Sequence, residues 1–264
     1  MIDSIAIPQS GERFVDIHCH CLPGIDDGPR TCEQSLDLCR ALVEDGIDVA
    51  IATPHQLGRY CDNTSDRIRG EVGRLNEELQ RNDIALMVEA GGDVRVDERI
   101  CRLLEEDEIL TLADCGRYIL IELPHDIFLD IEPLLKQFSS IGVVPIVSHP
   151  ERHIYLSQRP EIISDWIGCS AQFQITAGSL LGDFGALAKR ACLQFIKSRF
   201  ISVVATDSHG MGRRKPCMTA AFELITAEFG IEVAESLCVE NPRRILKGLN
   251  TVSVKDVISL AYKN

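Results

Sequence analysis

The chain lacks long apolar runs and an excess of positive charge, and each absence argues against a class of protein. It contains no run of eighteen apolar residues, which a membrane-spanning helix would need. Its formal charge over 264 residues is −13, which disfavours nucleic acid and anionic membrane surfaces as partners, because phosphate selects the opposite sign. The amino terminus also lacks the basic start and apolar stretch of a signal peptide. We therefore predict a cytoplasmic protein without stable membrane insertion.

The cysteines likewise lack the spacing of a disulfide framework or a redox motif. There are eleven, an odd number, and no two are spaced as Cys-x-x-Cys. Several lie within apolar helical patterns, where a thiol behaves as a small hydrophobic group; these are Cys39, Cys101, Cys192 and Cys238. The pattern indicates reduced thiols in an intracellular protein.

Two windows fit Cys-x5-Arg, the spacing of a cysteine-phosphatase loop, and neither has the right content. The window at residues 61–67 contains Asp62 and Asp66 and no glycine, so it would repel phosphate and could not wrap amides around it. The window at residues 238–244 contains Pro242, which removes one amide. We interpret both as coincidences.

Seven short apolar segments alternate with helical patterns along the chain. The expected strands are residues 14–17, 49–52, 84–88 or 84–96, 118–121, 143–147, 171–175 and 200–205. The expected helices are residues 31–45, 65–81, 98–106, 131–141, 160–167, 187–198, 216–229, 231–238 and 242–249, and the segment to residue 264 is either a helix or a loose tail. Successive strand–helix units imply parallel strands with crossover helices. No Gly/Ser/Pro linker divides them, so we predict one α/β domain over residues 1–264, with a core at about 14–250. We expect it to close as a barrel rather than form an open sheet.

Potential metal ligands stand after most of the expected strands. His18 and His20 are two apart at the end of the first strand, so both imidazoles point to one side. The whole set is His18, His20, Asp27, His55, Asp93, Glu122, His149, Asp207 and His209. Each residue alone is more simply a satisfied polar group, but equivalent positions in successive units would meet at one rim of a barrel. Nine nitrogen and oxygen donors exceed what one ion takes, so the set implies two or three divalent ions.

The motifs around these residues resemble those of the polymerase and histidinol phosphatase (PHP) superfamily. They are Asp-Ile-His-Cys-His (16–20), Ile-Asp-Asp-Gly-Pro (25–29), Ala-Thr-Pro-His (52–55), Ile-Glu-Leu-Pro (121–124), Ser-His-Pro-Glu-Arg (148–152) and Thr-Asp-Ser-His (206–209). Residues 26–29, 148–152 and 174–179 are similar to the bacterial tyrosine phosphatases of capsule and exopolysaccharide clusters. The resemblance covers about residues 14–250. It implies a distorted (β/α)7 TIM-like barrel with a trinuclear site, most often of manganese, with iron or zinc as alternatives.

The resemblance also implies which residues share an ion. The first ion would be held by His18, His20, Asp93 and Asp207; the second by Asp93, Glu122 and His149; the third by Asp27, His55 and His209. Asp93 would bridge the first two ions, at a position where the superfamily usually has Glu. Because Asp is one methylene shorter, bridging needs a small backbone shift. Glu89 is the competing residue for this role.

The implied chemistry is hydrolysis of a phosphate ester. Clustered dications lower the pKa of a bound water and so supply hydroxide for attack on phosphorus. By position alone, Arg152 and Arg214 would be solvated loop residues, but the resemblance implies contacts with phosphoryl oxygens, with Arg213 as an alternative to Arg214. A phenolate leaving group, with a parent pKa of about 10, needs little protonation. His55 or His209 could assist it.

The expected substrate is the phosphotyrosine tail of a bacterial tyrosine kinase that controls polysaccharide chain length. A small-molecule phosphatase, such as histidinol-phosphate phosphatase, is the alternative within the same chemistry. A relative that binds metal without turnover is the alternative from another class. Amidohydrolase chemistry is disfavoured, because the fourth strand ends on Glu122 and not on the bridging lysine that such sites often use. The sequence carries no indication of the oligomeric state.

Overall fold

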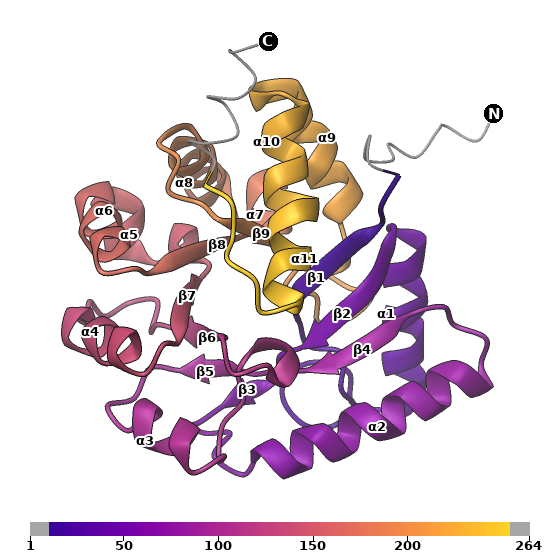
Figure 1. The fold of residues 1–264 in the computed structure, drawn as a ribbon. Coiled ribbons are helices and arrows are strands. Elements are labelled where there is room, and N and C mark those ends of the chain that lie inside the picture. The colour runs from indigo at the N-terminus through magenta and orange to yellow at the C-terminus, as the bar shows by residue number, and fades with distance from the viewer. Residues whose placement is uncertain (1–10, 254–264) are drawn as a thin grey trace.

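The computed structural model describes residues 11–253, in which parallel strands are surrounded by helices (Figure 1). The strands are β1 (Phe14–Cys19), β2 (Ile47–Ala52), β3 (His55–Gln56), β4 (Met87–Ala90), β5 (Asp93–Arg95), β6 (Tyr118–Glu122), β7 (Val144–Ser148), β8 (Gln172–Thr176) and β9 (Val203–Ala205). The α-helices are α1 (Cys32–Glu44), α2 (Ser65–Arg81), α3 (Ile100–Glu105), α4 (Glu132–Ser140), α5 (Ile154–Gln158), α6 (Pro160–Gly168), α7 (Ala177–Leu181), α8 (Ala186–Lys197), α9 (Met218–Phe229), α10 (Ile231–Glu235) and α11 (Asn241–Leu246). Two 3-10 turns, η1 (Leu112–Asp114) and η2 (Pro150–Arg152), and a π-helix, η3 (Ser236–Glu240), complete the described chain.

Every pair of neighbouring strands is parallel, as the alternation of strands and helices predicts. The strands form two sheets, with orders β1-β2-β4 and β3-β5-β6-β7-β8-β9. The predicted α/β class is therefore confirmed, but the strands of residues 11–253 do not hydrogen-bond into one closed barrel. Two backbone bonds join the end of β1 to the segment after β9: the Asp207 amide donates to the His18 carbonyl (2.8 Å), and the His20 amide donates to the Ser208 carbonyl (2.9 Å).

One predicted strand is broken in two and one short strand, β3, was not predicted; both features position the site. The strand predicted at 84–88 or 84–96 is instead β4 and β5, separated by Gly91 and Gly92. A Cβ atom at Gly92 would lie 2.2 Å from Oε1 of Gln56, so only glycine allows this approach. The neighbouring strand β2 ends at Ala52, as predicted, and Thr53 and Pro54 separate it from β3. As a result, β2 pairs with β4 while β3 pairs with β5, which sets His55 opposite Asp93.

Four helical segments were not expected from the sequence: α5, α7 and the turns η1 and η2. The strand predicted at 200–205 is shorter in the structure, where β9 begins at Val203. The two helices predicted at 231–238 and 242–249 form one continuous run from α10 through η3 to α11. The segment after residue 253, predicted as a helix or a tail, lies outside the described residues.

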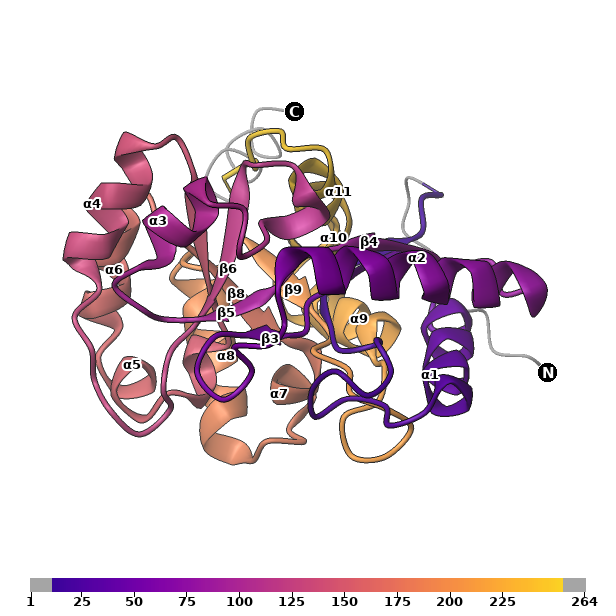
Figure 2. The same ribbon diagram turned by 90° about the horizontal axis from the view of Figure 1, so that it is seen from below.

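The helices cover the outside of the strands, with α4 and α6 on one side and α1 and α2 on the other (Figures 1 and 2). A small apolar cluster gathers alternate residues of β1, β2, β6, β7 and β9, among them Val15, Ile17, Leu120 and Ile146. Strands of both sheets therefore enclose one apolar interior. Within residues 11–253, no helix combines the length and the apolar composition that a membrane span requires.

Candidate metal centre

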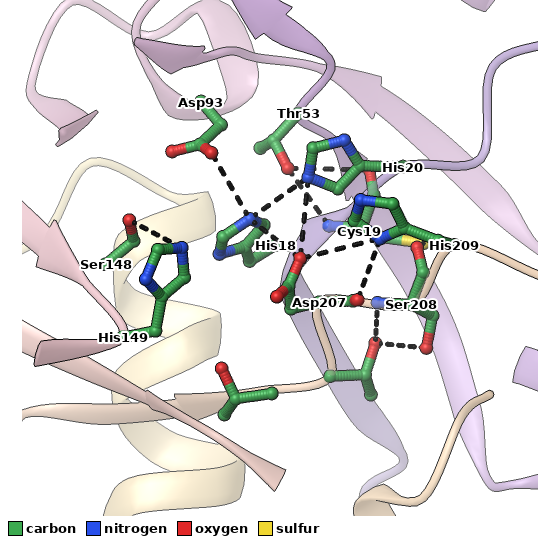
Figure 3. Close-up of polar contacts among 12 residues, drawn as sticks. His18, Cys19, His20, Thr53, Asp93, Ser148, His149, Asp207, Ser208 and His209 are labelled. Carbon is green, nitrogen blue, oxygen red and sulfur yellow. Dashed lines mark hydrogen bonds and ion pairs between the residues drawn. The ribbon is translucent and has the colours of Figure 1, made fainter. Parts of the chain in front are cut away.

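The nine residues predicted as metal ligands lie together at the carboxyl ends of the strands, although they span the chain from residue 18 to residue 209. Figure 3 shows part of this cluster: His18, His20, Asp93, His149, Asp207 and His209. They fall into groups whose donor atoms lie within 4.8 Å of one another: His18–His20–Asp207, His18–Asp93–His149, His55–Asp93–Glu122 and His20–Asp27–His55–His209. Shared members link the groups into one cluster, so the geometry provides neighbouring sites for more than one ion.

The alternation of side chains along β1 aims His18 and His20 at the same point. Their Nε2 atoms are 3.2 Å apart, and Oδ1 of Asp207 lies 3.3 Å from Nε2 of His18 and 3.5 Å from that of His20. All three side chains are buried. Two imidazole lone pairs and a carboxylate oxygen that face one another form a donor set that suits a divalent cation.

Unsatisfied buried atoms provide an independent test of whether a cation fits here. Both carboxylate oxygens of Asp93 are buried and have no hydrogen-bond partner among the described residues, and the same holds for Nε2 of His209. Burying a carboxylate without a donor is costly, so such groups are normally paired or bound to metal. Asp93 lies 3.1 Å from Nδ1 of His55 and 3.8 Å from Nε2 of His18, so its carboxylate can face two ions.

Two residues behind the cluster fix the orientation of its imidazoles. Nδ1 of His18 donates to Oε1 of Gln174 (2.9 Å), and Nδ1 of His20 donates to Oδ2 of Asp26 (2.6 Å). These contacts leave each Nε2 with its lone pair toward the centre, which is the usual arrangement around metal-bound histidines. Gln174 and Asp26 both lie within motifs of the sequence. The spacing that predicted His18 and His20 as ligands did not predict that these two residues orient the imidazoles.

Burial keeps these imidazoles neutral, as metal ligands must be. It lowers the pKa of His18, and it lowers the pKa of His20 to about 3, with His209 nearby adding to the effect. His55 differs: burial would lower its pKa, but the negative charge of the neighbouring Asp27, Asp93 and Glu122 carboxylates raises it to about 11. Burial and the neighbouring Asp93 raise the pKa of Glu122 to about 7. Protons and cations therefore compete for the same carboxylates.

Two cluster residues adopt backbone conformations that are unfavourable outside glycine. His149 has φ 34° and Asp207 has φ 54°, both in the left-handed region. Such conformations persist where the surrounding structure enforces them, and they concentrate at functional sites. At Asp207 the enforcing contact is the backbone bond to the His18 carbonyl.

Arg152 and Arg214 both reach the cluster and line its cavity, which has a volume of about 480 Å³. Nη2 of Arg152 donates to Oδ2 of Asp207 (2.5 Å), and Nη2 of Arg214 donates to Oδ1 of the same carboxylate (2.6 Å). These two arginines hold the pKa of the buried Asp207 well below its usual range, together with His18. Arg213 instead donates to the carbonyl of Asp183 and is exposed, so the placement favours Arg214.

The structure also shows where the alternative candidates for ligand and nucleophile lie. Glu89 lies in β4 and belongs to none of the donor groups found in residues 11–253, whereas Asp93 belongs to two. Cys61 is exposed and Cys238 is buried in η3, and neither lines the cavity. His125 was missed: it stacks on His149 with ring centroids 5.1 Å apart and forms a donor group with Glu122 and His149.

The parallel strands gather imidazoles, carboxylates and arginines around one cavity. This arrangement defines the class of the protein as a metal-dependent hydrolase with an α/β fold. Residues 14–247 match the family described as "Capsular polysaccharide synthesis, CpsB/CapC". The chain belongs to this family, which confirms its resemblance to the capsular phosphatases.

Relatives and a solved structure agree with that assignment. The chain is 34% identical over 235 residues to the tyrosine-protein phosphatase YwqE of Bacillus subtilis, covering 89% of this chain and 92% of the relative. It is 27% identical over 239 residues to the tyrosine-protein phosphatase CpsB of Streptococcus pneumoniae, covering 88% and 98%. A solved structure from work on YwqE and CpsB, "unique metal-dependent tyrosine phosphatases", superposes with a TM-score of 0.87 at 33% identity, covering 90% and 96%.

Proposed function

We propose that this protein is a metal-dependent protein-tyrosine phosphatase that acts on a tyrosine kinase of capsular or exopolysaccharide synthesis. The observation that carries the proposal is the convergence of nine potential metal ligands in one cluster, in a chain of the CpsB/CapC family. Asp27, His55, Glu122 and His149 of this cluster line the adjoining cavity together with Arg152 and Arg214. The substrate would be the phosphotyrosine-bearing tail of that kinase, because the relatives are tyrosine-protein phosphatases.

The cluster is large enough to hold two or three divalent ions, for which manganese, iron and zinc all have suitable ligands. His18, His20, Asp93 and Asp207 would hold the first, Asp93, Glu122 and His149 the second, and Asp27, His55 and His209 the third. This division agrees with the distances from Asp27 Oδ1 to Nε2 of His55 (3.4 Å) and of His209 (3.3 Å). Asp93 would be shared by the first two ions, which its membership of two donor groups supports.

Ions bound in this centre would supply an activated water and neutralise phosphoryl charge. Arg152 and Arg214 would orient the phosphoryl group, because each guanidinium keeps N–H donors that Asp207 does not use. Asp207 in turn holds both arginines in place through its two oxygens. His55, which lines the cavity, or His209 could protonate a leaving phenolate, although such a good leaving group requires little help.

We also propose that the described sheets are two parts of one distorted (β/α)7 barrel in a single domain. The shared apolar interior and the backbone bonds between the His18–His20 and Asp207–Ser208 segments support this arrangement. Eleven free thiols without a disulfide fit the reducing cytoplasm, where we place the enzyme.

Turnover of three phosphate esters by the metal-loaded protein tests the function. We expect a higher kcat/KM for a phosphotyrosine peptide than for a phosphoserine peptide or histidinol phosphate. Chelation should abolish the activity and addition of Mn²⁺ should restore it. A higher kcat/KM for histidinol phosphate would make the protein a small-molecule phosphatase, and bound metal without turnover of any ester would make it an inactive relative.

A further inference from the structure

Two arginines at the mouth of the cavity have no part in the chemistry proposed above. Arg59 lies in the turn after β3, Arg95 ends β5, and both line the cavity that contains the metal cluster. Among residues 11–253, no carboxylate pairs with Arg59; its guanidinium instead lies over the ring of Tyr60, 4.9 Å from the centroid. The chain has a formal charge of −13, so a positive charge without a carboxylate partner, as at Arg59, is a feature that binding of an anion would explain.

Arg59 lies in a turn that packs against the side chain of Arg95. The Tyr60 amide donates to the Leu57 carbonyl (3.0 Å), and Leu57 and Gly58 have φ of 68° and 57°. A Cβ atom at Gly58 would lie 3.2 Å from Cδ of Arg95. Glycine at position 58 therefore permits both the left-handed backbone conformation and the close approach of the aliphatic part of the Arg95 side chain. Strain of this kind is typical of segments held in place for binding.

The turn is also tied to the metal cluster. The Tyr60 ring stacks on the imidazole of His55, with centroids 5.3 Å apart and planes 20° apart. The partner of Arg95 is Glu122, whose Oε2 lies 3.6 Å from Nη1, and an ion held by Glu122 would draw its charge away from Arg95. Both guanidinium groups are then available to an anion that enters with the substrate.

We infer that Arg59 and Arg95 form a second anion site, which selects phosphotyrosine segments carrying another negative group close to the phosphotyrosine. This inference rests on the proposed function and names its substrate class. The second group is either a carboxylate or another phosphate, since guanidinium binds both in the same way. The side chain of Arg95 is 47% exposed, so the contacts form near solvent and weaken as salt rises.

The test compares three phosphotyrosine peptides of equal length, with neutral flanks, with flanking Asp and Glu, or with a second phosphotyrosine. Each peptide is assayed with the metal-loaded wild type, Arg59→Glu, Arg95→Gln and Arg190→Glu. Arg190 is the control, because it is exposed on α8 and does not line the cavity. The readout is the ratio of kcat/KM between an anionic peptide and the neutral one, together with its dependence on NaCl.

We expect the wild type and Arg190→Glu to favour an anionic peptide by roughly three- to thirtyfold, the range that two exposed ion pairs provide. The ratio should fall toward one in Arg59→Glu, in Arg95→Gln, and in the wild type at high salt, mainly through KM. Whichever anionic peptide is preferred identifies the second group. Equal kcat/KM for all peptides in the wild type, or a ratio unchanged in Arg59→Glu, would overturn the inference alone. Hydrolysis of none of the peptides would overturn the proposed function and this inference with it.

Discussion

Replacing Gln174 with leucine should weaken metal binding without disturbing the fold. Oε1 of Gln174 accepts a hydrogen bond from Nδ1 of His18 at 2.9 Å, and both side chains are fully buried. Nε2 of Gln174 has no hydrogen-bond partner among the described residues. The substitution therefore removes one side-chain contact, the one that keeps the lone pair of His18 Nε2 directed at the cluster.

The size of the effect follows from that single contact. Loss of an outer hydrogen bond to a metal-bound histidine typically costs about 10- to 100-fold in metal affinity. Leaving a buried N–H without an acceptor costs about 1–3 kcal/mol, which corresponds to a similar factor. Because His18 belongs to two donor groups, we expect more than one ion to be weakened.

Competition of the apoprotein with a fluorescent chelator for Mn²⁺ measures this affinity, and circular dichroism checks the fold. The matched control is Gln172→Leu in the same strand, whose amide donates to Thr251 instead of a histidine. We expect the control to bind Mn²⁺ as the wild type does. An affinity in Gln174→Leu within twofold of the control would refute the reasoning, because His18 would then need no orientation to bind metal.

Three further predictions follow from other contacts. His149→Ala should abolish turnover while leaving the circular dichroism spectrum unchanged, and near-normal turnover would count against the metal assignment. Asp45→Ala should lower the free energy of unfolding in urea by about 1–2 kcal/mol, since its carboxylate accepts the amides of Met218 and Thr219 at the start of α9; an unchanged midpoint would contradict this. Burial lowers the pKa of His153 below its ordinary 6.5, while its Nδ1 accepts the Leu156 amide. On acidification, the unfolded chain therefore takes up a proton on His153 at a higher pH than the folded chain does. The stabilisation of the folded state by neutral His153 is present above pH 6.5 and is lost as pH falls through the lowered pKa. Hydrogen exchange at Leu156, corrected for intrinsic rates, should lose protection on acidification, and constant protection would disprove the assignment.

The cluster could be predicted from the sequence because two of its causes are local. Side chains alternate along a strand, and the ends of strands can be recognised from short stretches of sequence. His18 and His20 needed only the alternation of side chains along β1, and the parallel order of strands placed His149 and Asp207 at the same end. The break at Gly91–Gly92 and the short strand β3 could not be anticipated in this way. The close approach of Gly92 to Gln56 joins segments that are distant in sequence.

Supporting residues were harder to predict than ligands. Gln174 orients His18 across 156 positions of sequence, and no spacing rule connects two residues so far apart. His125 lies three residues after the end of β6, in a segment that reads as an ordinary polar turn, yet it stacks on His149. Such contacts depend on how loops fold back over the strand ends, which hydrophobic periodicity does not describe.

Anomalous diffraction from crystals of the metal-loaded protein tests the central claim most directly. The account predicts at least two metal peaks in the cluster, each within about 2.0–2.6 Å of its ligands, with Asp93 between two ions and His18, His149 and His209 each bound to one. A single peak, or metal bound away from these residues, would contradict it.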